Sequence, residues 1–434
     1  MATHKTDKAD KQITVIVIGA GNRGTVYSNY AVDFPERLKV VGVADPRKFR
    51  RTLIQKNHNI PDDKVFEDWE DVVKQDKFAD AVIIATPDRC HREPAIQCAD
   101  KGYHILLEKP MDVTAAGCKA IVEAVKRNNV LLGVGHVLHY FPPAMTIKRL
   151  IDEGAIGEVI NIQHLEPVGW GHFAHSFVRG NWHREDDSCF VLLAKCGHDI
   201  DLIHWWMGKH KCLKVSSFGS LAHFNKEHKP EGAASRCLDC SVESKCAYSA
   251  KQMYLDGPFG VRMGNEGWPV TAVVDNPNVE TVTEALRTGP YGKCVYDTDN
   301  DVCDNQVVNF SFSEGRTATL SMVAFTEKLC TRSVKVFGTK GEIQCLNFNE
   351  VTLFDFVTRK TSKYPFISGA HGTRMTGHGG ADFYIMDAFV KAVARNDPSF
   401  LCTAANTLES HLLTFAAEKS RLEGKIISME TDTL

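Results

Sequence analysis

The first third of the chain alternates short apolar runs with amphipathic stretches. A run that is apolar at every position, such as ITVIVI at 13–18, is typical of a strand buried on both faces. Similar runs cover 38–45, 79–87, 104–108 and 130–135. Helical patterns lie between them, over 46–57, 91–101 and 113–129, with Thr114 as an N-cap. This alternation predicts a parallel, right-handed, doubly wound sheet.

The pattern changes after residue 136. A helix that begins with prolines is predicted over 142–154, and a half-exposed strand over 157–166. Alternating segments then cover 306–312, 316–325, 333–338, 341–347 and 350–356, with FSEGRT and GTKGE as hairpin loops, and they predict an antiparallel sheet. We therefore expect a disordered tail (1–11), a first domain (12–136) and a second domain (137–434). Within the second domain, 225–300 has little periodicity and reads as an insertion or lid.

Composition narrows the class of protein. The chain has 434 residues, more than one average domain, and its 43% hydrophobic and 24% charged residues are typical of soluble proteins. A net charge of −3 gives no electrostatic reason to expect nucleic acid or a membrane as partner. The polar N-terminus does not resemble a signal peptide, and no apolar run approaches the roughly 20 residues of a membrane span. We expect a cytoplasmic protein whose 14 cysteines are mostly reduced.

A glycine loop follows the first predicted strand. GAGNRG places Gly19, Gly21 and Gly24 in the G-x-G-x-x-G spacing, with Asn22 and Arg23 between them. The loop lies between a strand and a helix, the context in which this motif binds the pyrophosphate of a dinucleotide. Amide groups at the helix start would face the phosphates.

Two further strand ends are candidates for cofactor contacts. Asp45 ends the second strand, where an acid accepts hydrogen bonds from the ribose hydroxyls and repels a 2′-phosphate, which favours NAD over NADP. The basic residues that follow could soften this preference or form a solvated helix face. In ATPDRCH (85–91), Thr86 and Pro87 are expected to line the nicotinamide–ribose channel, whereas His91 either joins them or begins the next helix.

GAGNRG, Asp45, ATPDRCH and LLEKP occur in the order and spacing of a known family. Together they resemble the Gfo/Idh/MocA oxidoreductases, named for glucose–fructose oxidoreductase and inositol dehydrogenase. The resemblance implies an α/β protein. An N-terminal Rossmann domain would be followed by a C-terminal α/β domain with a large, mostly antiparallel sheet. It also implies NAD(P), a sugar or polyol substrate, and a homodimer or homotetramer.

The lysine of LLEKP is the first candidate catalytic residue. In the family the corresponding lysine projects into the active site beside the nicotinamide, which assigns that place to Lys109, with Glu108 as an anchor. Pro110 restricts Lys109 to an extended backbone, and a cis Lys109–Pro110 bond is plausible at a sharp turn. Such a lysine can hydrogen-bond a substrate hydroxyl or assist its deprotonation.

AKCGHDIDLIHWWMG (194–208) resembles the family's active-site helix, and His198 matches the histidine that meets the reacting hydroxyl. The family's polyol dehydrogenases carry an aspartate four residues earlier, where this chain has Ala194. Lys195, which shares a helix face with His198, would replace that aspartate, bind a substrate oxygen or indicate different chemistry. The alternative for His198 is a core histidine bonded to nearby backbone, and Asp199 would contact the substrate or orient His198.

Two segments rich in polar rings are candidates for substrate contacts. Aromatic faces with hydrogen-bonding tips suit sugar rings, although an ordinary crowded loop is the alternative for each residue. The candidates are Glu166, His172, His175, Arg179 and Trp182, together with His378 beside two glycines.

Cys237, Cys240 and Cys246 form the one cysteine cluster with metal-like spacing. C-x2-C suits a zinc knuckle, but the third spacing is irregular and no fourth ligand is evident, unless Cys212 or a nearby histidine supplies it. We therefore favour free thiols and no metal.

These patterns lead to one main hypothesis and two alternatives. The main one is an NAD-dependent dehydrogenase of a sugar, cyclitol or related polyol, in which Lys109 and His198 handle the hydroxyl proton. The first alternative is an NAD-dependent glycosidase that works by transient oxidation and elimination. The second is a non-catalytic NAD-binding regulator.

Overall fold

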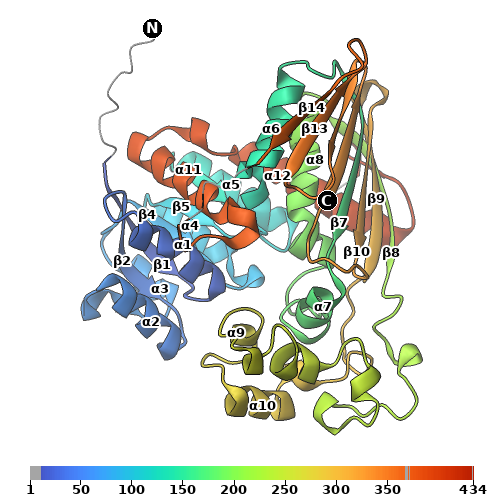
Figure 1. Ribbon diagram of the computed structural model, residues 1–434. Coiled ribbons are helices and arrows are strands. Elements are labelled where there is room, and N and C mark those ends of the chain that lie inside the picture. Colours follow the sequence, from blue (N-terminus) through green and yellow to red (C-terminus); the bar gives the residue numbers. More distant parts are fainter. Residues whose placement is uncertain (1–10, 367–369, 371, 433) are drawn as a thin grey trace.

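Two sheets organise the protein. The computed structural model describes residues 11–366, 370, 372–432 and 434, and Figure 1 shows one sheet at each side of the molecule. The predicted tail therefore lies outside the described residues, except for Lys11. Among the described residues, no helix combines the length and apolar character that crossing a membrane requires.

The first sheet has six parallel strands in the order β3-β2-β1-β4-β5-β6; the parallel sheet and five of its strands were predicted from the apolar runs, and β3 was not. All but one residue of β1 are fully buried, because helices cover both faces. The strands are β1 (Ile13–Ile18), β2 (Leu38–Ala44), β3 (Val65–Phe66), β4 (Ala81–Ile84), β5 (His104–Leu107) and β6 (Leu132–Val134). The helices between them are α1 (Asn22–Asp33), α2 (Lys48–His58), α3 (Trp69–Lys74), α4 (Arg92–Asp100) and α5 (Ala115–Arg127). Thr114 caps α5 as predicted, because its hydroxyl accepts a hydrogen bond from the Gly117 N–H at 3.0 Å.

The second sheet has nine strands in the order β14-β13-β12-β11-β7-β10-β9-β8-β15. It is antiparallel except for the β7–β10 pair. The strands are β7 (Val159–Pro167), β8 (Cys212–Ser220), β9 (Asn305–Phe312), β10 (Thr317–Val323), β11 (Ser333–Gly338), β12 (Gly341–Cys345), β13 (Glu350–Asp355), β14 (Thr361–Pro365) and β15 (Ile427–Ser428). Burial alternates along β10, which is why a period of two was visible in the sequence.

Three helices lie along one face of this sheet: α6 (Pro142–Asp152), α8 (Gly197–Met207) and α12 (Ala404–Glu423). The remaining long helix, α11 (Ala381–Arg395), returns to the first domain and packs against α1. A Cβ on Gly133 of β6 would lie 3.2 Å from the Phe389 ring of α11, so the two domains meet closely. This return places C-terminal residues beside the cofactor half of the protein.

The segment 225–300 forms a helical lobe beside α7 (Trp170–Phe173). It contains α9 (Val270–Val273), α10 (Val279–Thr288) and several single turns. Its own core is small and comprises Cys237, Ala250, Tyr254, Leu255, Val270, Val282, Leu286 and Tyr291. Whether the lobe acts as a lid stays a prediction.

Candidate active site

The glycine loop has the shape that a dinucleotide phosphate requires. Gly19 has a φ of +90°, and a Cβ there would lie 2.5 Å from the Ala85 carbonyl oxygen. A Cβ on Gly24 would lie 2.0 Å from the Gly19 oxygen, so α1 packs directly against the turn. Helix α1 starts after Gly21 without a side-chain cap, and Asn22 is exposed. The first amides of α1 therefore remain for an anion, and the loop fits the pyrophosphate of NAD.

Asp45 lies beside this loop at the end of β2. It is buried, and its carboxylate accepts hydrogen bonds from the Ala20 N–H and the Arg47 N–H, both at 2.8 Å. The half-exposed Arg47 guanidinium also donates to it, at 3.2 Å. The acid thus lies beside the glycine loop with a cation across it, and its contact with the ribose stays a prediction.

Glu108 anchors the backbone of Lys109 at the end of β5. Its Oε2 accepts the Lys109 N–H at 2.9 Å, and its Oε1 accepts from Arg23 Nε and the Tyr27 hydroxyl, both at 2.7 Å. Burial would raise the pKa of Glu108, but Arg23 and Lys109 outweigh it and lower the pKa. The Lys109–Pro110 bond is cis, as the sequence suggested.

Arg23 links the two domains, and its charged guanidinium does not face the glycine loop. Its two terminal nitrogens donate to Asp382 of α11 at 2.8 and 3.0 Å. Asp382 also contacts His378 Nδ1 at 3.0 Å. Burial would raise the pKa of Asp382, but Arg23 and His378 outweigh it and lower that pKa.

His91 supports the turn after Lys109. Its ring is buried, with Nδ1 2.6 Å from the Pro110 carbonyl oxygen and Nε2 2.9 Å from the Thr86 carbonyl oxygen. Both nitrogens are therefore engaged within the chain. Thr86 donates its hydroxyl to the Cys90 carbonyl at 2.9 Å, and Pro87 is exposed.

The Lys109 side chain reaches the second domain. Its Nζ donates to the carbonyl of Ala194, the position at which the resemblance led us to expect an aspartate. Ala194 and Lys195 belong to a π-helical turn (Leu192–Cys196) that precedes α8. The predicted regular helix is thus wrong at this point, because a π turn holds more residues than an α turn and changes the directions of the side chains.

His198 has an unsatisfied nitrogen close to two other imidazoles. Its ring is 5% exposed, and Nδ1 has no hydrogen-bond partner among the described residues. The ring centre lies 5.7 Å from that of His136 and 6.0 Å from that of His378. Burial, Lys109 and His136 hold the pKa of His198 well below its usual value, so the ring is neutral at neutral pH.

His136 was not predicted. It is buried, and neither of its ring nitrogens has a hydrogen-bond partner among the described residues. A signal existed, because His136 follows β6, and doubly wound sheets hold ligands at the carboxyl ends of their strands.

Lys195 belongs to a second polar cluster. Its Nζ lies 3.2 Å from His172 Nε2, 2.9 Å from Cys330 Sγ and 3.6 Å from Glu166 Oε1. Burial would lower the pKa of Lys195, but Cys330 and Glu166 outweigh it and raise the pKa. Burial and Lys195 hold the pKa of His172 well below its usual value. The cluster therefore pairs a charged amine with a neutral imidazole.

Arg332, which no sequence pattern indicated, links this cluster to Asp199. Its Nε lies 2.8 Å from Glu166 and 2.7 Å from Asp199. Asp199 also contacts His164 Nε2 at 2.7 Å. Asp199 is fully buried and bound to these groups, so no hydrogen bond joins it to His198 among the described contacts.

Profiles of two domains match nearly the whole chain. The profile "Oxidoreductase family, NAD-binding Rossmann fold" matches residues 13–136, and "Oxidoreductase family, C-terminal alpha/beta domain" matches 148–429. The chain belongs to the Gfo/Idh/MocA oxidoreductase family. Both the fold class and the NAD-binding character of the first domain are thereby confirmed.

Relatives within the Gfo/Idh/MocA family differ in the reactions that their names give. The scyllo-inositol 2-dehydrogenase (NAD(+)) of Bacillus subtilis is 34% identical over 283 residues, 65% of this chain and 70% of that protein. The 2,7-anhydro-N-acetylneuraminate hydratase of Escherichia coli is 29% identical over 153 residues, 35% of this chain and 40% of that protein. The solved scyllo-inositol dehydrogenase from Lactobacillus casei, with NAD(H) and scyllo-inositol, has a TM-score of 0.64 at 17% identity. That match covers 97% of this chain and all of the other, and it shows a shared fold.

Three of the predicted substrate contacts have their polar groups engaged elsewhere. The Trp182 indole donates to Asp88 at 2.8 Å, and His175 Nδ1 lies 2.8 Å from the Tyr254 hydroxyl. The Arg179 guanidinium points into the helical lobe, as described below. By contrast, His172 and Glu166 meet Lys195, and His378 meets His198. The structure thus gathers these three residues, but not the other three, around the two candidate catalytic groups of the second domain.

Proposed function

We propose that this member of the Gfo/Idh/MocA family oxidises a secondary hydroxyl of a sugar, cyclitol or related polyol with NAD. The observation that carries the proposal is the position of Lys109. Its backbone is fixed by Glu108 at the end of β5, and its amine reaches the segment that begins α8. Residues 12–136 would hold the cofactor and 137–434 the substrate.

The chain's own groups suit proton handling at a hydroxyl. Bound NAD would supply the hydride acceptor. His198 is neutral and has an unpartnered Nδ1, so it can accept a hydrogen bond from the hydroxyl. The Lys109 amine, which needs only to leave the Ala194 carbonyl, can hold the same oxygen and share its proton. The unpartnered nitrogens of His136 would orient the substrate from the side.

The test is Lys109→Ala, assayed as NADH formation over a panel of sugars and cyclitols. We expect loss of at least about 100-fold in turnover, the scale of general acid–base catalysis. NAD binding, followed by calorimetry, should stay within about twofold because the glycine loop is untouched. Lys119→Ala removes an exposed lysine of α5 and serves as the control. Full turnover by Lys109→Ala would exclude the proposed role.

A second candidate function rests on the Lys195 cluster. The neutral His172 imidazole can accept a proton from the carbon next to a carbonyl formed by transient oxidation, while the charged Lys195 amine beside it stabilises the resulting enolate. Elimination and return of the hydride would then leave no net NADH. The hydratase names among the relatives agree with this scheme. Deuterium from solvent in the product, without net NADH, would establish it, whereas stoichiometric NADH would exclude it.

A further inference from the structure

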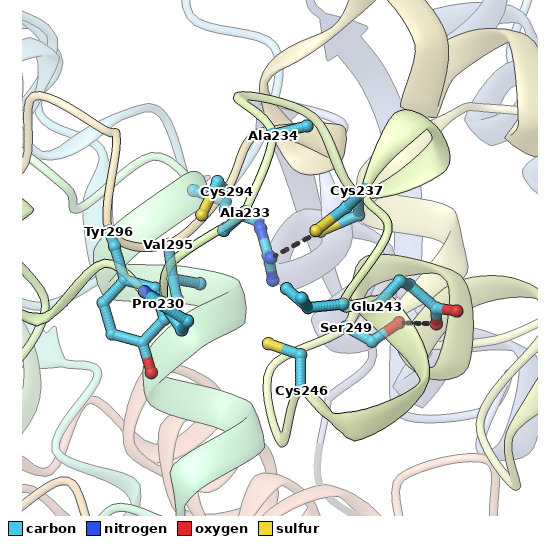
Figure 2. Close-up of a pocket in the computed structure, with 13 residues that line it drawn as sticks. Pro230, Ala233, Ala234, Cys237, Glu243, Cys246, Ser249, Cys294, Val295 and Tyr296 are labelled. Carbon is cyan, nitrogen blue, oxygen red and sulfur yellow. Dashed lines mark hydrogen bonds between the residues drawn. The ribbon is translucent and has the colours of Figure 1, made fainter.

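Four cysteines line one small cavity in the helical lobe. Its volume is about 20 Å³, room for a single water or ion. Figure 2 shows the thiols of Cys237, Cys246 and Cys294 around this space, and Cys240 also lines it. All 14 cysteines lie in the described part of the chain, and none forms a disulfide. Cys294 is the fourth member that the sequence did not reveal.

The backbone explains how Cys294 reaches the other three. Arg236 and Lys293 form an isolated antiparallel bridge, and the Cys294 N–H donates to the Ser235 carbonyl at 2.9 Å. This pairing sets Cys294 beside the C-x2-C turn that starts at Cys237. Because the pairing joins segments more than fifty residues apart, local spacing carries no trace of it.

A buried cation, Arg179, also faces the same cavity. Arg179 is 2% exposed and lines the cavity, and no acid forms an ion pair with it among the described residues. Nε and Nη2 donate to the Lys293 and Tyr248 carbonyls at 2.7 and 2.8 Å, and Nη2 lies 3.4 Å from Cys237 Sγ. Nη1 has no partner. A buried guanidinium normally needs an anion. The carboxylate that lines the cavity, Glu243, instead accepts from the Ser249 hydroxyl and lies 3.9 Å from Lys251, which leaves the thiolates as the anions for Arg179.

We propose that Cys237, Cys240, Cys246 and Cys294 bind one structural zinc ion. Zinc takes four thiolates tetrahedrally, with Zn–S distances of about 2.3 Å. Binding turns four thiols into thiolates and releases their protons, and Arg179 would offset part of the net negative charge of the site. The size of the cavity suits one ion and excludes a cluster of several atoms.

The sulfur atoms must close in when the metal binds. Among the described residues, only His139, Asp201 and Cys402 bring three ligand atoms within 4.8 Å of one another. The four thiols are spaced more widely than that, but rotation between staggered χ1 positions moves a cysteine sulfur without moving the backbone. The group at His139 lacks a fourth protein ligand and already uses Asp201 as the partner of the His139 ring.

The site would brace the lobe against the candidate active site. The lobe has few buried apolar residues for its length. Small domains with so little core are often stabilised by a bound metal ion. Arg179 ends the segment that carries His172 and His175, and Trp268 of the lobe packs 5.4 Å from the His172 ring. Loss of zinc would therefore disturb the position of His172.

The experiment is metal analysis of the full-length protein, purified without chelators. We expect about one zinc ion per chain, and at least about tenfold less in Cys294→Ser, because a structural site needs all four ligands. Two controls should keep their zinc: Cys345→Ser, which alters a buried thiol elsewhere, and Cys402→Ser, which alters the competing cluster. Zinc that survives Cys294→Ser, or disappears with Cys402→Ser, would overturn the proposal.

A second measurement covers the case in which the serine variants fail to fold. Wild-type protein is exchanged with Co²⁺, whose visible absorption distinguishes tetrahedral thiolate ligation from oxygen or nitrogen ligation. Intense thiolate-to-cobalt bands and protection of four thiols from alkylation, lost together on chelation, are expected. No bound metal, iron with labile sulfide, or a disulfide among the four cysteines would each overturn the proposal.

Discussion

The two halves of the candidate active site treat their buried polar groups in opposite ways. On the first-domain side, Glu108 accepts three hydrogen bonds and Arg23 bridges two carboxylates. On the substrate side, His198 of α8 keeps a ring nitrogen without a partner among the described residues, and His136, the last residue of the first domain, keeps both. Buried polar atoms are nearly always satisfied in folded proteins, so unsatisfied ones call for a ligand.

We infer that the first side positions Lys109, whereas the second side recognises the substrate. The first side is satisfied before any ligand arrives, so it fixes Lys109 relative to the glycine loop. The unpartnered nitrogens of His198 and His136 would gain hydrogen bonds from the proposed polyol substrate. Variants on the first side should therefore reduce stability and turnover, whereas variants on the second side should mainly change the handling of substrate. The following predictions test this division, from the largest expected effect to the smallest.

Arg23→Met should have the largest effect. It leaves Glu108 and Asp382 buried without their shared cation, which typically costs about 3–5 kcal/mol in the free energy of unfolding. Urea denaturation measures the loss. Arg37→Met is the control, because its ion pair with Asp387 is half-exposed and should contribute at most about 1 kcal/mol. If Arg23→Met is nearly as stable as wild type, this network does not stabilise the first side.

His198→Gln tests the second side. Gln keeps hydrogen-bonding capacity but cannot serve as an imidazole base, so kcat should fall about 100-fold while stability changes little. Steady-state kinetics and a urea titration make the two measurements. His204→Gln is the matched control, because His204 lies on the same helix and its ring contacts the exposed Glu409. Equal losses in both variants would assign the effect to the helix and not to the site.

The parts of the fold and site that local patterns could reveal are those made of neighbouring residues. Most strands of both sheets, the glycine loop, Asp45, Lys109 and the Thr114 cap follow from periodicity or short motifs, whereas β3, β8, β14 and β15 were not predicted. The Arg23–Asp382 pair joins residues 359 positions apart, and the π turn before α8 depends on packing. Neither leaves a periodic trace in the sequence. Lys195 and His198 are close in sequence, but a regular helix could not predict their different surroundings.

Glu185→Gln should reveal a smaller, pH-dependent effect on the second side. Burial and Glu418 raise the pKa of Glu185 from 4.5 to about 7, opposite to Glu108. A raised carboxyl pKa means that the folded state prefers the protonated form, so wild-type stability falls as pH rises from 4.5 to about 7. Glu185→Gln should thus match wild type near pH 4.5 and exceed it by about 1 kcal/mol at pH 8, after allowance for partial exposure. Urea denaturation at both pH values measures the difference in stability. A gain at pH 4.5 alone would contradict the prediction. Asp186→Asn, which alters an exposed side chain, should show no pH-dependent gain in stability.

The smallest expected effect concerns the cofactor. Arg47 lies across the Asp45 carboxylate and offers a positive charge where NADP carries its 2′-phosphate. Arg47→Ala should free the acid for the ribose hydroxyls and raise the NAD-to-NADP ratio of kcat/KM by about two- to fivefold, the scale of a half-exposed ion pair. Lys56→Ala, at the far end of α2, should leave the ratio unchanged. A shift toward NADP in Arg47→Ala would mean that Arg47 orients Asp45 for the ribose and does not compete for it. In that case even the half-exposed Arg47–Asp45 pair would be held in its working position before NAD binds. The cofactor side would then differ even more from the unpartnered imidazoles on the substrate side.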